Sequence, residues 1–119
     1  MRQGYWYLAT PYSNYEGGIE KAFEDACRAT AMLLKQGYHV YSPIAHSHSV
    51  AKIGGIDPKD HSIWLAADEP MMDAARGLIV CAMPGWEDSF GVNKEIHKFH
   101  DDMKDILLMS WPDGSVSKL

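Results

Sequence analysis

The stretch from Pro84 to Glu95 holds the residues whose types and spacing are best suited to chemistry. The helix predicted to follow Ser89 has apolar residues at helical spacing, which form one stripe: Val92, Ile96, Phe99 and Met103. Glu95 falls at the edge of this stripe, roughly 70° from its centre. Because an unpaired buried carboxylate costs several kcal/mol, Glu95 is either a candidate for chemistry at the floor of a pocket or a boundary residue that reaches water.

The residues before Glu95 are suited to holding a ligand at the start of this helix. Asp88 and Ser89 are good N-cap residues, and the free N–H groups of a helix N-terminus can bind an anion. Gly85 and Gly91 would let a ligand approach the backbone closely. Hydroxyl groups also follow the first predicted strand, on Thr10, Tyr12 and Ser13. Ordinary capping and turn formation are the alternative roles for these residues.

Other titratable residues offer less specific signals. His46 and His48 fall on one side of an extended segment, but no third ligand is spaced to complete a metal site, so we expect no metal. A hydrogen bond from His48 to a substrate is the alternative. Asp68 comes shortly before Pro70 in a predicted helix, so it either points into a cleft or lies in water. The sequence has no nucleophile elbow, dinucleotide fingerprint or P-loop, and no cofactor is expected.

The composition predicts one globular domain spanning residues 1–119. The chain has 119 residues, 46% of them hydrophobic, and a net charge of −5. Its scattered lysines and arginines argue against a nucleic-acid partner. Cys27 and Cys81 lie in apolar patterns typical of buried free thiols in a reducing compartment. No targeting segment or membrane-spanning run is expected, so the predicted location is cytoplasmic with no membrane partner.

Strand and helix patterns alternate along the chain and must position these residues. The apolar patterns predict strands at residues 5–9, 38–42, 77–82 and 105–110. They predict helices at residues 18–35, 62–75 (interrupted at Pro70) and 89–103. Residues 44–62 are predicted to form a long functional loop with at most one helical turn, and the residues after Ser110 a short polar tail.

This alternation predicts an α/β fold, a small doubly wound parallel sheet of four to five strands in the order 2-1-3-4 with helices on both faces. In such sheets a ligand binds beyond the carboxyl ends of the strands, where the strand order reverses. The sequence therefore predicts a cleft formed by residues 10–13, 42–48 and 83–89.

Three of these motifs together resemble the nucleoside 2-deoxyribosyltransferase-like superfamily. The first is the run from Tyr7 to Ser13, and the second is Ser42-Pro43 followed by His46 and His48. The third is the most specific: a glycine-tryptophan loop, Gly85-Trp86, followed by Ser89, Gly91 and Glu95. The resemblance covers nearly the whole chain and is strongest to small bacterial and phage proteins, and the chain is also similar to nucleotide N-hydrolases.

The resemblance implies a function and a role for each matching residue. Glu95 would be the nucleophile on the anomeric carbon of a nucleoside or nucleoside 5′-monophosphate, forming a glycosyl-enzyme intermediate. Asp68 would be the partner acid, with Asp73 as a second candidate. The residues implied to bind the substrate are Tyr7, Thr10, Tyr12, Ser13, His48, Gly85, Trp86, Ser89 and Gly91.

The expected activity is cleavage of an N-glycosidic bond, by an N-hydrolase or a deoxyribosyltransferase. Hydrolysis is favoured because residues 115–119 offer no counterpart to the C-terminus with which one transferase subunit completes its neighbour's site. The partners expected are a small-molecule nucleoside or nucleotide and further copies of the chain, in a dimer or larger assembly. A non-catalytic nucleotide-binding sensor and a purely structural flavodoxin-like domain are the alternatives.

Overall fold

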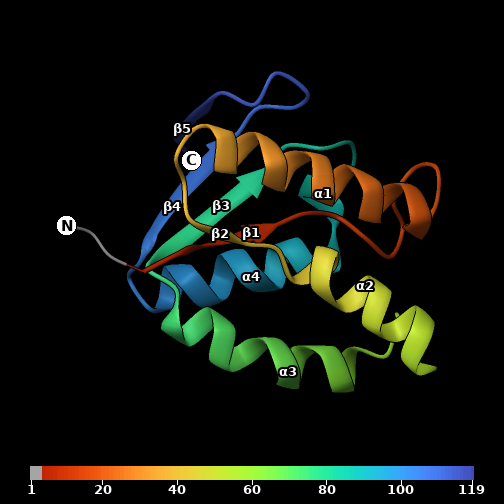
Figure 1. The fold of residues 1–119 in the computed structure, drawn as a ribbon. Coiled ribbons are helices and arrows are strands. Elements are labelled where there is room, and N and C mark those ends of the chain that lie inside the picture. Colours follow the sequence, from red (N-terminus) through yellow and green to blue (C-terminus); the bar gives the residue numbers. More distant parts are fainter. Residues whose placement is uncertain (1–3) are drawn as a thin grey trace.

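The computed structural model describes residues 4–119, and its centre is a five-stranded sheet (Figure 1). The strands are β1 (Trp6–Ala9), β2 (Val40–Tyr41), β3 (Gly77–Cys81), β4 (Asp105–Met109) and β5 (Val116–Lys118). Their order is β2-β1-β3-β4-β5. The first four strands are parallel, and β5 runs antiparallel to β4. The predicted α/β class and the order 2-1-3-4 are confirmed.

Helices cover both faces of this sheet. The helices are α1 (Ile19–Lys35), α2 (Pro43–Gly54), α3 (His61–Ala74) and α4 (Phe90–Asp101), with a 3-10 turn, η1 (Trp86–Asp88). Helix α1 lies on one face, and α3 and α4 lie on the other (Figure 1). Strands β1 and β3 are buried throughout, which is why their sequences are apolar without alternation.

The core has two parts because the side chains of each strand alternate between the faces. Leu8 and Ile79 pack under α1, whereas Tyr7 and Val80 pack under α3 and α4. Within residues 4–119, no helix combines the length and the apolar character needed to cross a bilayer.

The prediction of a loop over residues 44–62 is wrong, because most of that segment is helix α2. Ser42 caps this helix by accepting a hydrogen bond from the backbone N–H of Ala45 at 3.1 Å, and Pro43 follows at the first helical position. Gly55 ends the helix with a φ of 75°. The buried side of α2 includes His48, so its sequence shows little apolar periodicity.

The predicted interruption at Pro70 is also wrong, since α3 continues through it to Ala74. A proline inside a helix removes one backbone donor and crowds the preceding turn, but Pro70 lies on the exposed side, where the freed carbonyl can meet water.

Three smaller expectations are corrected at the ends of elements. The tail after Ser110 is not free of structure, because Gly114, with a φ of 84°, turns the chain back so that β5 pairs with β4. Helix α4 ends at Asp101, and Met103 is exposed instead of closing the apolar stripe. Both cysteines are free, but Cys27 is exposed and only Cys81 is buried.

Candidate active site

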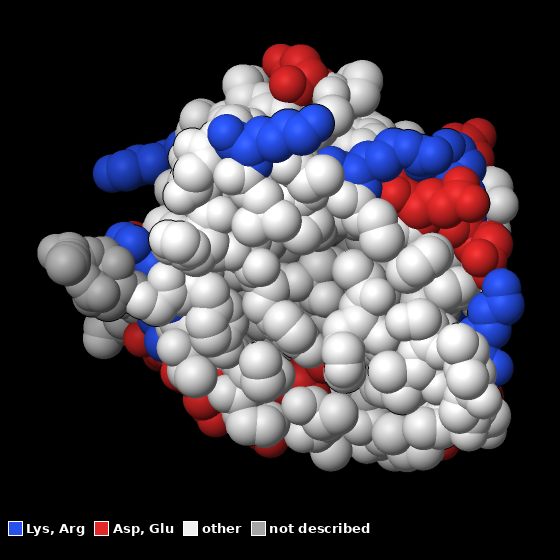
Figure 2. All heavy atoms as spheres, in the orientation of Figure 1, with Lys and Arg blue, Asp and Glu red and all other residues white. Residues whose placement is uncertain are grey.

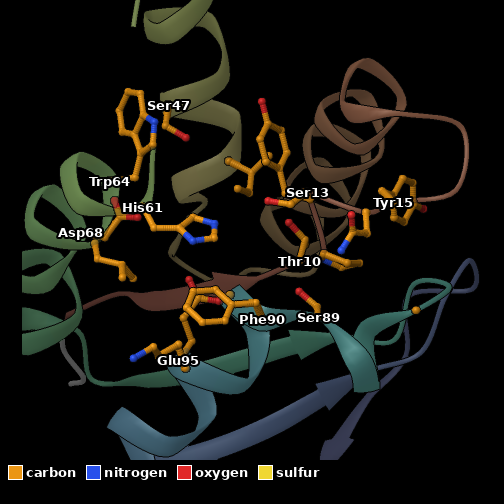
Figure 3. Close-up of a pocket in the computed structure, with 18 of the residues that line it drawn as sticks. Thr10, Ser13, Tyr15, Ser47, His61, Trp64, Asp68, Ser89, Phe90 and Glu95 are labelled. Atoms are coloured by element: carbon orange, nitrogen blue, oxygen red, sulfur yellow. The ribbon is translucent and has the colours of Figure 1, made fainter. Parts of the chain in front are cut away.

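A cavity of about 350 Å³ opens beside the carboxyl ends of β1 and β3 (Figure 3). Its walls come from the loop after β1, from α2 and α3, and from the start of α4. It is lined by the following residues singled out in the sequence: Tyr7, Thr10, Tyr12, Ser13, Asp68, Gly85, Asp88, Ser89, Gly91 and Glu95. His48 and Trp86 do not line it.

Besides Asp88, which is exposed in the turn before α4, two carboxyl groups line the cavity from different helices. Glu95 comes from α4, whose buried residues Val92 and Phe99 pack on the sheet and leave Glu95 at the edge of the packed face. Asp68 comes from α3, on the other side of the cavity in Figure 3. Asp73, the second candidate acid, is exposed and pairs with Lys98. The structure therefore brings Asp68, and not Asp73, into the cavity with Glu95.

The surroundings of these carboxyls disfavour their charged forms. Burial, together with the negative charge of Asp68, raises the pKa of Glu95 to about 8, although the Tyr7 hydroxyl opposes the shift. Burial likewise raises the pKa of Asp68 to about 6, although Tyr7 and His46 oppose the shift. Because like charges in one cavity repel, the pair retains about one proton near neutral pH. Such a pair offers one carboxylate and one carboxylic acid, which is the combination needed for nucleophilic and acid catalysis.

Tyr7 belongs to the same cluster and is fully buried. Its ring packs between Tyr41, at a centroid distance of 5.9 Å, and Phe99, at 5.7 Å. Among the described residues its hydroxyl has no partner at normal hydrogen-bond geometry. The hydroxyl is nevertheless near enough to Glu95 and Asp68 to lower the pKa of each. A buried hydroxyl beside two carboxyls is placed to donate to whichever one is ionised.

A second polar region lies where α4 begins. Ser89 caps α4 by accepting from the backbone N–H of Val92 at 3.3 Å, and Asn93 steadies the preceding turn by donating to two of its carbonyls. Thr10 lies nearby, at the same side of the cavity as Ser89 in Figure 3. Thr10 is only 5% exposed, and its buried hydroxyl, like that of Tyr7, has no partner among the described residues. An unpartnered buried hydroxyl next to a helix N-terminus is suited to an anionic or hydroxylated ligand.

Besides Asp68, the inner side of α3 contributes residues that the sequence analysis did not identify. Its residues lining the cavity are spaced as one helical face: His61, Trp64, Leu65, Asp68 and Met72. This i, i+3, i+4, i+7 pattern lies in the helix predicted over residues 62–75, which differs from α3 by one residue at each end, but a face of mixed polar and aromatic residues does not by itself indicate a cavity. Phe90, at the start of α4, stacks on His61 with ring centroids 4.6 Å apart, so α3 and α4 meet across the cavity.

His48 and Trp86 have structural surroundings of their own. His48 is buried on α2, with one ring nitrogen bonded to Tyr12 and the other to Glu20. Trp86 packs against the part of the core beneath α4. The direct substrate hydrogen bond expected from His48 does not match its position, because both of its ring nitrogens already have protein partners.

Within residues 4–119, no three side chains of histidine, cysteine, aspartate or glutamate converge as metal ligands would.

Over residues 4–111 the chain matches a protein family described as a domain of unknown function, DUF1937. A search among curated proteins finds no match.

Proposed function

Since the chain belongs to the DUF1937 family, whose description names no activity, we propose from its cavity that it cleaves the N-glycosidic bond of a nucleoside or nucleoside 5′-monophosphate. One observation carries this proposal: Glu95 and Asp68 enter one cavity from two helices, beside the buried hydroxyl of Tyr7. Their raised pKa values leave one acid and one base for the reaction. The match of Glu95 to the helix glutamate of the nucleoside 2-deoxyribosyltransferase-like superfamily agrees with it.

The proposed reaction has two steps. Glu95 attacks the anomeric carbon, so that an ester bond to the sugar forms while the bond to the base nitrogen breaks. Asp68 gives its proton to the departing base. Water, or a second base, then attacks the same carbon and loses a proton to Asp68, and the ester bond breaks to restore the Glu95 carboxylate.

The positive charge that develops on the sugar in the transition state explains how the proton shared by Glu95 and Asp68 comes to lie on Asp68. Without a positive charge above it, Glu95 has the higher pKa of the two carboxyls. The transition state carries positive charge on the sugar, and a positive charge above Glu95 favours its ionised form. The proton is then held by Asp68, where the departing base needs it. Tyr7 donates a hydrogen bond that steadies the Glu95 carboxylate.

The start of α4 supports a phosphorylated substrate. The Thr10 hydroxyl and the N-terminus of α4 provide hydrogen-bond donors at one side of the cavity. Of the described residues that line the cavity, Lys94 alone is a lysine or arginine. A 5′-phosphate placed against Ser89 and Gly91 would leave the sugar over Glu95, one turn further along the helix.

The proposal also includes self-association and a cytoplasmic location. The faces of α2 and α3 expose apolar side chains, notably Ile53, which is 88% exposed, with Val50 and Ile63. Figure 2 shows few charged side chains over the middle and lower part of this view. We expect a dimer in sedimentation velocity, and a concentration-independent monomer would contradict it. The two free cysteines suit a reducing compartment.

Glu95→Gln tests the activity. Nucleosides and their 5′-monophosphates are incubated with the protein, and released base is measured by chromatography. The variant should lose base release by more than about a thousandfold while remaining folded, because the amide cannot attack the sugar. Glu87→Gln is the matched control, since Glu87 is exposed and outside the cavity. Wild-type turnover by Glu95→Gln would refute the mechanism. Nucleotide binding with no base released by the wild type would favour the sensor alternative.

A further inference from the structure

A chain of three hydrogen-bonding side chains leads from the surface of α1 to the wall of the cavity. Glu20, on α1, accepts from Nε2 of His48 at 2.9 Å, and Nδ1 of His48 lies 2.7 Å from the hydroxyl oxygen of Tyr12. Tyr12 lines the cavity, whereas the side chain of Glu20 is 57% exposed. Neither Glu20 nor His48 has a part in the reaction proposed above, so their arrangement needs a separate explanation.

The His48 ring is held firmly in this position. Its side chain is only 4% exposed, and the ring of Phe23 stacks on it with centroids 4.5 Å apart and an angle of 20° between the planes. Tyr12 meets its edge, with ring centroids 5.8 Å apart. A ring held from several sides keeps one orientation, so each of its nitrogens keeps one partner.

The charge of Glu20 decides which nitrogen carries the proton. The hydrogen bond from His48 lowers the pKa of Glu20, and Lys52, 3.7 Å away, lowers it further, so Glu20 is ionised at neutral pH. A carboxylate only accepts hydrogen bonds, so Nε2 of His48 must carry a proton. In the neutral imidazole Nδ1 is then bare and accepts a hydrogen bond.

The position of the proton on Nε2 determines the direction of the hydrogen bond between His48 and Tyr12. The bare Nδ1 accepts from Tyr12, which has a single hydroxyl proton to give. Burial, and secondly the charge of Glu20, raises the pKa of Tyr12, so the hydroxyl keeps its proton. With that proton committed to His48, the Tyr12 oxygen has only lone pairs left for a ligand.

We propose that Glu20 and His48 are positioning residues that fix the Tyr12 hydroxyl as a hydrogen-bond acceptor in the cavity wall, so that the cavity selects a ligand presenting a hydroxyl or amino donor there. Naming that donor as a sugar hydroxyl or base amino group rests on the proposed function. The arrangement disfavours a phosphate or carbonyl oxygen at the same point, because two acceptors would face each other. Tyr12 and the start of α4 thus bind opposite kinds of group.

The first test needs no ligand and no variant. Nitrogen NMR of the wild-type protein with labelled histidine distinguishes a protonated from a bare ring nitrogen. In its neutral form, His48 should have a protonated Nε2 and a bare Nδ1. Protonation of Nδ1, alone or together with Nε2, would overturn the proposal, because Tyr12 would then be free to donate to the ligand.

The second test removes the negative charge of Glu20, which sets the direction of the hydrogen bonds made by His48 and Tyr12. Glu20→Gln is compared with Glu24→Gln, which lies on the exposed side of the same helix and faces Arg28. Calorimetry with a bound nucleoside or nucleotide should give roughly threefold to tenfold weaker binding for Glu20→Gln. Glu24→Gln should bind as the wild type does, and equal affinities for both variants and the wild type would overturn the proposal.

The third test asks for the donor on the ligand. Analogues in which one sugar hydroxyl or base amino group is replaced by fluorine or hydrogen are compared on the wild type and on Tyr12→Phe. One replacement should weaken binding about tenfold on the wild type and have little effect on Tyr12→Phe. If no replacement distinguishes the two proteins, the proposed selection is wrong. If nucleotides bind but none loses its base, the proposed function fails while these binding results still decide the role of Tyr12. If no nucleoside or nucleotide binds, the NMR result alone decides the direction of the hydrogen bonds between Glu20, His48 and Tyr12.

Discussion

The carboxyl groups of Glu95 and Asp68 make the stability of the protein depend on pH. Glu95 has an ordinary pKa of 4.5, and burial raises it to about 8 in the folded chain. Between these values the folded state binds more protons than the unfolded state, so the free energy of unfolding falls as pH rises. Asp68, with a pKa raised to about 6, acts in the same direction over a lower range. Ionisation of this pair therefore costs stability.

Removing the charge at Glu95 should stabilise the protein in alkaline solution. At pH 8.5 the Glu95→Gln variant should unfold with a free energy on the order of 1–3 kcal/mol higher than the wild type, because the amide is buried without a charge. The difference should shrink at pH 5, where the folded wild type is protonated at Glu95. Urea unfolding at both pH values measures it.

Glu87→Gln provides the comparison at the surface, where a change of within about 0.5 kcal/mol is expected. A Glu95→Gln variant that is less stable than the wild type at pH 8.5 would mean that the carboxylate is satisfied in the folded chain. A variant that gains stability and loses base release would show that this carboxylate is kept for chemistry at the expense of the fold.

Sequence patterns identify single unusual residues better than they identify networks of hydrogen-bonded side chains. Glu95 was recognised as unusual from its place beside an apolar stripe, which is a local property of one helix. The connection of His48 to Glu20 and Tyr12 joins residues 28 and 36 positions apart. No periodicity spans such separations, so the sequence predicted a contact between His48 and substrate where the structure has a contact between His48 and protein.

Helix starts determine much of the cavity, and the two serine caps make this testable. Ser42 caps α2 and Ser89 caps α4, each by accepting a backbone N–H three residues ahead. Replacing either with alanine should lower the free energy of unfolding by about 1 kcal/mol. Under the proposed function, only Ser89→Ala should also weaken binding of a nucleoside 5′-monophosphate, because only Ser89 lines the cavity.

Chemical unfolding and calorimetry on the same two variants separate these effects. Equal loss of nucleotide affinity in both variants would indicate that lower stability of the fold, and not a lost contact with the ligand, weakens binding. That result would argue against a phosphate at the start of α4. Loss of stability in only one variant would show that the other serine does not act as a cap.

At the scale of elements, apolar periodicity predicted α1 and α3 to within one or two residues at each end but missed α2. Helix α1 was predicted closely because alanine and leucine form most of its buried side, which also includes Asp25. Helix α2 buries His48, and α3 turns His61 and Asp68 toward the cavity, so both lack a clean stripe. The elements that form the cavity are thus the ones whose pattern is weakest, since ligand-facing positions are not chosen for packing.

The whole molecule was more predictable than its parts. Alternating strands and helices, together with the right-handed crossover rule, leave few ways to arrange four parallel strands, and the order 2-1-3-4 follows. The sequence pattern did not predict strand β5, because this strand is three residues long and only partly buried at the sheet edge. Its pairing depends on a turn at Gly114 and a neighbour, β4, that local sequence does not specify.

The close approach of three strands at Gly77 gives a last prediction, which concerns the sheet as a whole. A Cβ atom at Gly77 would lie 2.5 Å from the Trp6 ring on β1 and 2.7 Å from the carbonyl oxygen of Asp105 on β4. Gly77→Ala must therefore displace a neighbouring strand or the Trp6 ring, and should lower the free energy of unfolding by about 1–3 kcal/mol. Gly54→Ala is the matched control, because a Cβ there meets open space inside a helix, and stability should stay level or rise by up to about 1 kcal/mol. Urea unfolding midpoints compare the two. An unchanged midpoint for Gly77→Ala would mean that the strands can move apart at little cost in free energy. The spacing of β1, β3 and β4, which positions the cavity, would then be less rigid than these contacts indicate.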